Sequence, residues 1–375
     1  MATAQKNFHD PLDNYFRKLP EPNRDIQTKR VTVNQGVICS VENLTYDTYK
    51  VVIRCNEDSK QIVFKAGQYA TITVPGCRKP RSYSFALAQE NENKNEHSFF
   101  IRLVHGGKLS SWIAGENREG EHVKISGPLG KFGLDSSDKT MVCIAGGSGM
   151  SAINAIVQHA CNEQVTRDCY FFYGARTQAD LYLQEEMQEI ERKWNKKNSF
   201  KFIPVLSEEA EDSDWDGARG FVTDHFKDEY LSKGAVSVNN MKAFFCGPPV
   251  MIDLGVEALK EAGLADSDIY FDKFEDARSP APVVDNTKCV LCDECLMVKP
   301  TPNCLVEATN FKMNGGGEVS SFDRVQPAKT SGLYYNSLFI DENECIRCFA
   351  CVEACPHDAI SVDYDKVPKT LRKIS

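Results

Sequence analysis

Eight cysteines crowded between residues 289 and 355 constrain this chain more than any other feature. The first group has the spacing C-x2-C-x2-C-x8-C and consists of Cys289, Cys292, Cys295 and Cys304. The second has the spacing C-x2-C-x2-C-x3-C-P and consists of Cys345, Cys348, Cys351 and Cys355. Two-residue gaps let a looping backbone surround one small inorganic object with several thiolates. In a cytosolic chain this pattern indicates metal ligation, because disulfides are rare there.

A structural zinc ion is the alternative interpretation of these cysteines. Zinc takes four ligands, usually from two C-x2-C pairs. A C-x2-C-x2-C run supplies one ligand too many in a row, so we favour iron–sulfur clusters. The other seven cysteines are scattered along the chain, at Cys39, Cys55, Cys77, Cys143, Cys161, Cys169 and Cys246. For all of them except Cys246 we expect a buried apolar role.

The cysteine region resembles bacterial two-cluster ferredoxins, in which the fourth cysteine of each run binds the other cluster. The resemblance implies two 4Fe–4S clusters with crossed ligand sets. One cluster would be held by Cys289, Cys292, Cys295 and Cys355. The other would be held by Cys345, Cys348, Cys351 and Cys304. The sequence departs from this family in the x8 gap before Cys304 and in the insertion at 305–344, where we expect partner recognition or tuning of a cluster potential.

The rest of the chain is long enough for more than one sizeable core, with 375 residues of which 42% are hydrophobic. The formal net charge of −9 argues against a nucleic-acid partner, which requires a basic face. No run approaches the ~18 apolar residues of a membrane span. The N-terminus, MATAQKNFHDPLDNYF, lacks the features of a secretory signal, so we expect a cytoplasmic protein.

Hydrophobic patterning divides the chain into segments. Short apolar runs between Val31 and Gly133 alternate with turn residues, which predicts a small antiparallel barrel. After Asp135, buried strands alternate with helical stretches, which predicts a parallel sheet covered by helices on both faces. We therefore expect a multidomain chain: an N-terminal arm (1–32), an antiparallel β-barrel (33–135), an α/β parallel-sheet domain (136–276), a linker (277–288) and an α+β ferredoxin-like domain (289–375).

Two short motifs lie in the predicted barrel. The first, R-x-Y-S, consists of Arg81, Ser82, Tyr83 and Ser84, and the second, G-x-x-S, of Gly107, Lys108, Leu109 and Ser110. In this order they resemble the ferredoxin–NADP reductase superfamily. The resemblance implies that Tyr83 stacks on the isoalloxazine of FAD, that Ser84 acts near flavin N5, and that Arg81 holds the pyrophosphate. The second motif would bring amides and a hydroxyl to the phosphates. FMN is the open alternative to FAD.

Two further motifs follow in the predicted α/β domain. The first ends a strand and opens a helix, and it consists of Gly146, Gly147, Ser148, Gly149 and Met150. Glycines there let the backbone approach a pyrophosphate at the helix N-terminus. The second follows a later strand and consists of Cys246, Gly247 and Pro248. The same superfamily resemblance implies that this turn brackets the nicotinamide, with the Cys246 sulfur near the point of hydride transfer. Asp272 stands where glutamate is common in the family, and its role in proton movement is open.

The choice between NADH and NADPH depends on the end of the second α/β strand. Arg176 follows that strand and could pair with a 2′-phosphate. The surrounding A-R-T-x-x-D-L-Y text is similar to that of NADH-linked oxygenase reductases, so we favour NADH over NADPH. Further on, Ser207–Asp216 holds six carboxylates in ten residues, which we expect to be a solvated loop more than a guide for a basic partner.

Together the resemblances imply an electron-transfer enzyme that oxidises NAD(P)H and passes electrons through FAD and two 4Fe–4S clusters to a protein acceptor. A flavin is needed because it exchanges both hydride and single electrons. We favour the reductase component of a multicomponent oxygenase, of the monooxygenase or demethylase type. The alternatives are a diaphorase subunit of an anaerobic complex, such as a hydrogenase or sulfite reductase, and a non-catalytic relay subunit. The intact nicotinamide motifs argue against the relay.

Overall fold

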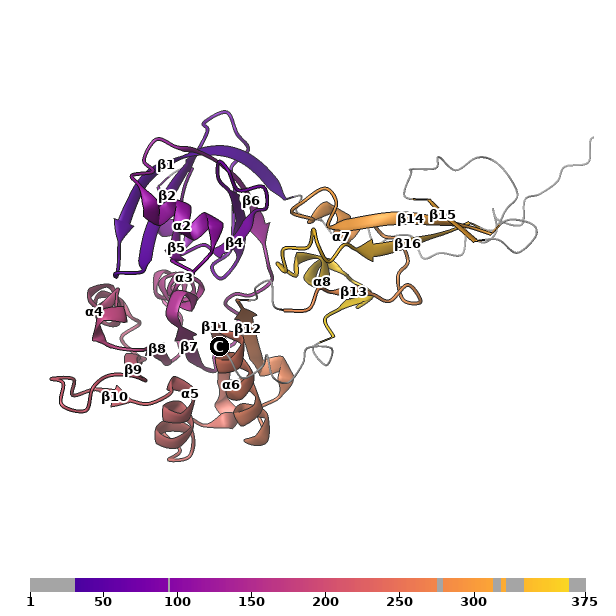
Figure 1. The fold of residues 1–375 in the computed structure, drawn as a ribbon. Coiled ribbons are helices and arrows are strands. Elements are labelled where there is room, and N and C mark those ends of the chain that lie inside the picture. Colours follow the sequence, from indigo (N-terminus) through magenta and orange to yellow (C-terminus); the bar gives the residue numbers. More distant parts are fainter. Residues whose placement is uncertain (1–30, 94, 275–278, 313–317, 322–333, 364–375) are drawn as a thin grey trace, which may run out of the picture. The chain divides into compact units, whose positions relative to one another are not determined.

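The computed structural model describes residues 31–93, 95–274, 279–312, 318–321 and 334–363 (Figure 1). Residues 1–30, which make up nearly all of the predicted N-terminal arm, lie outside the described residues. From residue 31 onward the chain forms one compact unit.

The first segment is an antiparallel barrel. Its strands are β1 (Thr32–Asn43), β2 (Thr48–Cys55), β3 (Tyr69–Thr73), β4 (Arg81–Ser84), β5 (Glu96–Arg102) and β6 (His122–Leu129). They lie in the order β4-β3-β6-β1-β2-β5. A bridge between Phe85 and Phe99 joins the two edges. Side chains alternate between interior and solvent, as at the buried Val123 and Ile125 of β6, and the barrel prediction is confirmed.

The second segment is a parallel sheet. Its strands are β7 (Thr140–Gly146), β8 (Cys169–Ala175), β9 (Phe200–Leu206), β10 (Ala218–Arg219), β11 (Met241–Gly247) and β12 (Ile269–Lys273). They lie in the order β10-β9-β8-β7-β11-β12. Strands β8, β9 and β10 therefore follow one another on one side of β7, and the chain then returns to place β11 and β12 on the other side of β7. Ligands of such sheets bind at this switch point, outside the carboxyl ends of the strands.

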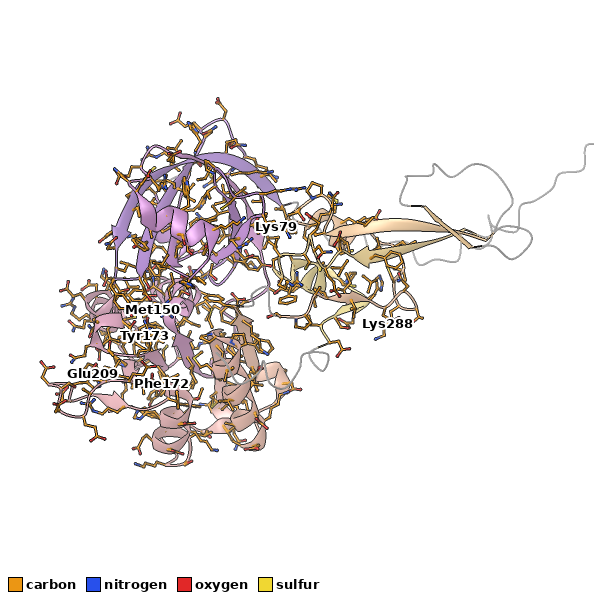
Figure 2. All side chains as sticks on the ribbon, in the orientation of Figure 1. Lys79, Met150, Phe172, Tyr173, Glu209 and Lys288 are labelled. Carbon is orange, nitrogen blue, oxygen red and sulfur yellow. The ribbon has the colours of Figure 1, made fainter. Side chains whose placement is uncertain are left out.

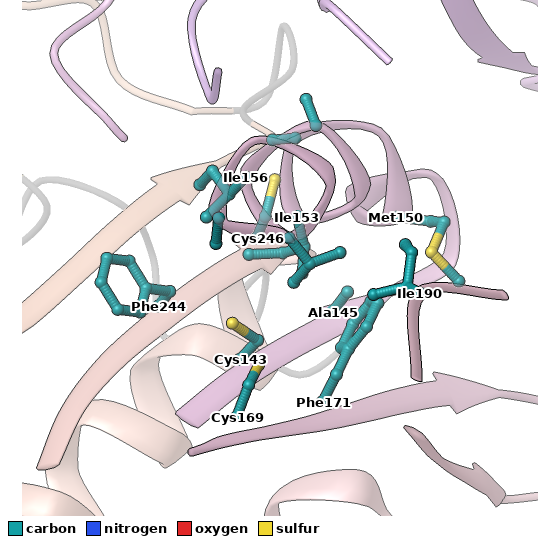
Figure 3. Packing of buried hydrophobic residues seen from close by; sticks show 14 of the residues in the cluster. Cys143, Ala145, Met150, Ile153, Ile156, Cys169, Phe171, Ile190, Phe244 and Cys246 are labelled. Atoms are coloured by element: carbon teal, nitrogen blue, oxygen red, sulfur yellow. The ribbon is translucent and has the colours of Figure 1, made fainter. Parts of the chain in front are cut away.

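Helices cover both faces of this sheet, as predicted. Successive side chains of β7 point to opposite faces. Cys143 and Ala145 pack in one buried cluster with α3 (Met150–Asn162) and α4 (Gln184–Lys193) (Figure 3). Val142 and Ile144 pack in a second cluster with α5 (Val222–His225) and α6 (Pro249–Glu261). The alternation explains why β7 is an apolar run on both faces instead of a half-polar strand.

The third segment is the α+β cysteine domain, also as predicted. It contains two short helices, α7 (Glu294–Met297) and α8 (Ala350–Ala354), each carrying one cysteine of a run. Strand β13 (Val283–Val284), inside the predicted linker, pairs with β17 (Ile360–Ser361). The insertion carries an antiparallel sheet of β14 (Leu305–Lys312), β15 (Glu318–Ser321) and β16 (Tyr334–Ile340).

Candidate functional site

The two predicted nucleotide motifs meet where β7 and β11 end. A Cβ atom at Gly149 would lie 2.1 Å from the Cys246 carbonyl oxygen, so no larger residue fits there. Gly247 has a φ of 142°, and a Cβ atom on it would lie 2.8 Å from the Gly146 carbonyl oxygen. The glycine turn and the turn at Cys246, Gly247 and Pro248 are thus in backbone contact.

A cavity of about 460 Å³ opens beside these turns. Gly146, Gly147, Arg176 and Pro248 line it, so four of the predicted nucleotide residues meet at one cavity. The hydroxyls of Tyr173 and Tyr182 each donate a hydrogen bond of 3.2 Å to the Gly147 carbonyl oxygen and hold the turn in place. Met150, also predicted to bind cofactor, is instead fully buried in the cluster that contains Tyr173 (Figure 2). Ser148 and Gly149 lie in the turn without lining the cavity.

A second cavity, of about 580 Å³, lies at the R-x-Y-S motif. One part of its wall is formed by the motif residues Arg81, Ser82, Tyr83 and Ser84. Another part is formed by residues 271–273 of β12 and by Phe274, which follows that strand. Arg81 is exposed and Tyr83 is half-buried, so both side chains are accessible to a ligand. The motif residues therefore fit the flavin that the sequence predicts at this place.

The second barrel motif differs from its predicted use in one respect. Gly107 precedes α2 (Lys108–Gly115), whose first turn has amides without intrahelical partners. The Ser110 hydroxyl, however, donates to the Gly107 carbonyl oxygen and accepts from the Val104 amide. The Leu109 side chain is buried in the barrel core, and Lys108 is exposed. This turn offers backbone amides and the Lys108 charge to a phosphate, whereas the Ser110 hydroxyl is already used.

Asp272 is the acid nearest to the predicted flavin motif. Its carboxyl lies in the second cavity, opposite the Ser84 hydroxyl. Desolvation of the carboxyl and the nearby charge of Glu353 raise the pKa of Asp272 to about 7, against a hydrogen bond from Ser84 that lowers it. The residue as a whole is half-buried. Asp272 can therefore change its charge near neutral pH.

Cys246 lies in the hydrophobic cluster beneath α3 (Figure 3). Its side chain is fully buried, among residues that include Phe244 and Ala145. Burial, followed by the charge of Asp272, raises the pKa of the Cys246 thiol well above its usual range. Any role of this residue at neutral pH is therefore that of a neutral thiol, not of a thiolate nucleophile.

The eight clustered cysteines separate into two sets of four around two small cavities. One cavity is lined by Cys289, Cys292, Cys295 and Cys355. The other is lined by Cys304, Cys345, Cys348 and Cys351. In each set one cysteine comes from the opposite run, which is the crossed arrangement that the sequence predicts. Among the described residues no three His, Cys, Asp or Glu side chains approach closely enough to hold a single metal ion.

The backbone around the two cysteine runs repeats itself. Leu291 and Asp293 in the first run have φ values of 56° and 63°. Arg347 and Phe349 in the second run have φ values of 58° and 53°. Left-handed residues at equivalent positions curl the chain so that consecutive thiols face one centre. Backbone amides also reach sulfur, as at Arg347, whose N–H donates to Cys345 Sγ at 3.4 Å. These residues fit a cubane better than one ion.

The cysteine domain also contributes to the second cavity. Ile346–Phe349, Val352 and Glu353 line it together with the R-x-Y-S motif. The Tyr69 hydroxyl of β3 donates a hydrogen bond of 2.7 Å to the Cys348 carbonyl oxygen. Sequence reasoning missed Tyr69 and Glu353, because a contact across 279 positions leaves no local pattern.

No helix in the described ranges is both long and apolar enough to cross a membrane.

Three segments of the chain match known domain families in the predicted order. Residues 35–133 match the oxidoreductase FAD-binding domain, and residues 143–256 match the oxidoreductase NAD-binding domain. Residues 338–361 match the 4Fe-4S binding domain. The last match includes the second cysteine run but not the first, which precedes it in the sequence.

Relatives of the chain are electron-transfer proteins. It is 40% identical over 215 residues to the xylene/toluene monooxygenase electron transfer component XylA of Pseudomonas putida, covering 57% of this chain and 59% of XylA. It is 31% identical over 258 residues to the reductase component of propane 2-monooxygenase from Mycolicibacterium smegmatis, covering 68% of each protein. The structure of Amycolatopsis cytochrome P450 reductase GcoB matches with a TM-score of 0.58 and 29% identity, over 65% of this chain and 70% of GcoB. The chain thus spans less than two thirds of the length of XylA.

Proposed function

Because this chain belongs to the ferredoxin reductase family of FAD- and NAD-binding oxidoreductases, we propose that it is the reductase component of a multicomponent oxygenase. It oxidises NADH and passes the electrons, through FAD and two 4Fe–4S clusters, to a protein acceptor. The reductase and electron-transfer components among its relatives support this assignment.

The observation that carries the proposal is the separation of eight cysteines into two sets around two cavities. Four thiolates around each cavity match the ligand count of a 4Fe–4S cluster. Burial raises the pKa of Cys295 to about 11 and that of Cys348 to about 12, so bound iron has to displace protons from these thiols. A pair of clusters explains all eight cysteines, whereas zinc leaves the repeated three-cysteine runs unexplained.

FAD supplies the exchange between a hydride and single electrons. Around it, Tyr83 offers a ring face in the second cavity, and Arg81 offers a positive charge for the phosphates. Ser84 and Asp272 place a hydroxyl and a titrating carboxyl in the same cavity. Cys246 begins the turn that would bracket the nicotinamide, and its thiol packs in the core cluster behind that turn.

The wall that the cysteine domain contributes to the second cavity supports electron exit in that direction. The Tyr69 hydroxyl donates a hydrogen bond to the Cys348 carbonyl oxygen. Cys348 lines one of the two small cavities together with Cys304, Cys345 and Cys351. The hydrogen bond therefore ties one cysteine set to the barrel that carries the flavin motif.

Iron analysis of paired cysteine variants tests the cluster arrangement. The wild type, purified without oxygen, should carry about eight irons and one flavin. Cys289→Ser with Cys355→Ser removes two ligands from one set and should leave about four irons. Cys345→Ser with Cys355→Ser damages both sets and should remove nearly all iron. If the first pair instead removes nearly all iron and the second leaves about four irons, the ligands are not crossed; Cys39→Ser, in the barrel, is the control.

Turnover with a reconstituted oxygenase tests the acceptor. The purified protein should support NADH- and oxygen-dependent hydroxylation when it is mixed with the oxygenase component of a related system. Electron delivery to a hydrogenase or sulfite reductase, without any oxygenase activity, would contradict the oxygenase assignment and leave the reductase chemistry intact.

A further inference from the structure

Four charged side chains line the first cavity, and a tyrosine is hydrogen-bonded to two of them. They come from two segments of the chain and comprise Tyr46, Asp47, Arg102, Arg176 and Asp180. Tyr46 and Asp47 belong to the turn between β1 and β2 of the barrel, and Arg102 ends β5. Arg176 and Asp180 follow β8, at the sheet edge where the adenosine ribose of a dinucleotide binds.

Arg176 is the centre of this group. Its Nη2 atom lies 2.6 Å from Asp180 Oδ1 and 3.5 Å from Asp47 Oδ2. It also donates to the Tyr46 hydroxyl, which in turn donates to Asp180 Oδ1 at 2.9 Å. Although desolvation acts in the opposite direction, hydrogen bonds from Arg176 and Tyr46 lower the pKa of Asp180, so this carboxylate is ionised at neutral pH.

Both carboxylates are anchored independently of Arg176. Asp180 Oδ2 accepts from the amide of Thr177 at 3.0 Å and from its hydroxyl at 3.1 Å. Asp47 Oδ2 accepts from Arg102 Nε at 2.9 Å, and its Oδ1 accepts from the Thr48 hydroxyl at 2.9 Å. Arg176 therefore meets two fixed negative charges, one supplied by each segment.

The acidic loop adds negative charge next to this group. Glu209 accepts hydrogen bonds from the Gln178 amide at 2.8 Å and from its side chain at 3.1 Å. Arg219 donates to the carbonyl oxygens of Glu209, Ala210 and Trp215 and so holds the loop against the sheet. Ser207, at the start of the loop, lines the cavity. The loop is thus solvated, as predicted, and is also fixed beside the ribose end.

NADPH differs from NADH by a 2′-phosphate, which carries between one and two negative charges at neutral pH. To bind that phosphate, Arg176 would have to leave Asp47 and Asp180 and expose two anchored carboxylates to a like charge. We infer that Asp47 and Asp180 are specificity-determining residues, which occupy Arg176 and make the site reject a 2′-phosphate. This inference rests on the proposed function and deepens it, because it gives the flavin barrel a part in nucleotide selection.

Comparison of NADH with NADPH in wild type and in the double variant Asp47→Asn, Asp180→Asn tests the inference. The wild type should prefer NADH by about 100-fold in kcat/KM. The double variant should narrow this preference to about tenfold or less. The change should lie in KM for NADPH and leave kcat unaltered, because the 2′-phosphate lies away from the reacting atoms. Binding of 2′,5′-ADP, measured against 5′-AMP by calorimetry on the same protein, should improve in parallel.

Glu189→Gln is the matched control, because it removes one negative charge from the exposed face of α4 outside the cavity. It should leave the nucleotide preference at the wild-type value. If the double variant loses flavin or iron, the single Asp47→Asn, which keeps the Asp180–Thr177 contacts, carries the test with a smaller change in the same direction. Wild-type use of NADPH equal to NADH, or an unaltered preference in these variants, would overturn the inference. Failure of both nucleotides to reduce the flavin would instead overturn the proposed function.

Discussion

Ser84 Oγ and Asp272 Oδ2 lie 3.4 Å apart, although 188 positions separate the two residues in the sequence. Ser84 ends β4 of the barrel, and Asp272 lies in β12 at the edge of the parallel sheet. Asp272 is also the register partner of Cys246 in the neighbouring strand β11. The two residues predicted to act at the hydride, Ser84 and Cys246, therefore flank one carboxyl group.

Asp272 should make flavin reduction depend on pH. Its pKa of about 7 means that the group is neutral below pH 7 and negatively charged above it. A negative charge in the second cavity, where we propose that the flavin binds, opposes the arrival of a hydride, so stopped-flow reduction by NADH should slow about three- to tenfold as pH rises through 7. Asp272→Asn resembles the protonated acid and should keep the fast rate at all pH values.

The control for this variant is Asp266→Asn, at an exposed carboxyl that pairs with Lys260 away from the cavity. It should retain the wild-type pH profile. A break near pH 7 that persists in Asp272→Asn would assign the titration to another group, with Glu353 of the same cavity as the first to examine.

Cys246→Ala should slow flavin reduction by NADH about tenfold or more while the iron and flavin contents stay at wild-type values. The variant opens a space behind the turn that we propose to bracket the nicotinamide, and so loosens the position of the nicotinamide ring. Cys143→Ala is a matched control, since Cys143 is equally buried in the same cluster but lies mid-strand in β7. Equal slowing of flavin reduction in both variants would show that the effect comes from lost core packing and not from the position of Cys246.

Gly149→Ala should abolish nucleotide binding and destabilise the α/β domain. The new Cβ atom would lie 2.1 Å from the Cys246 carbonyl oxygen, in a place where only backbone can move. We expect a loss of at least about 2 kcal/mol, typical of overpacking at a backbone contact. Gly115→Ala, at the end of α2 and 3.8 Å from its nearest neighbour, should be neutral in thermal melts. Wild-type NADH affinity in Gly149→Ala would contradict the contact between the two motifs.

Much of the fold could be predicted because it depends on local pattern. Alternating apolar residues mark the barrel strands, and runs such as TMVCIAGG mark strands that are buried on both faces. The cysteine sets could also be predicted, because the crossed pairing follows from the ferredoxin resemblance, and the cavities group the same residues. The matched families occupy the predicted order along the chain.

What could not be predicted depends on contacts between distant segments. From the sequence alone, Arg176 is compatible with either NADPH, whose 2′-phosphate it could bind, or NADH, which has no such phosphate. The structure pairs it with Asp47, which lies 129 positions away in the sequence. The Ser110 hydroxyl could not be known to be engaged by its own turn. Tyr69 and Glu353 carry no motif, and their places in the second cavity follow only from tertiary packing.

His97 should make the barrel less stable in acid. The side chain is buried in the barrel, its ring lies edge-on to Phe64 and Phe85, and neither ring nitrogen has a hydrogen-bond partner in the described part of the chain. Burial lowers the pKa of His97 to about 4 from its ordinary value of 6.5. The unfolded chain binds a proton below pH 6.5 while the folded barrel stays neutral, so stability is complete above pH 6.5 and falls as pH decreases toward 4.

At pH 5 the loss due to His97 should reach about 2 kcal/mol. Thermal release of flavin, followed by its fluorescence, should therefore show a midpoint that falls between pH 7 and pH 5. His97→Phe keeps an aromatic ring but cannot bind a proton, and its midpoint should fall less over the same range. His122→Gln, at an exposed position on β6, should follow the wild type, because it leaves the buried imidazole of His97 unchanged. Identical pH profiles for wild type and His97→Phe would show that other groups govern the acid sensitivity of the barrel.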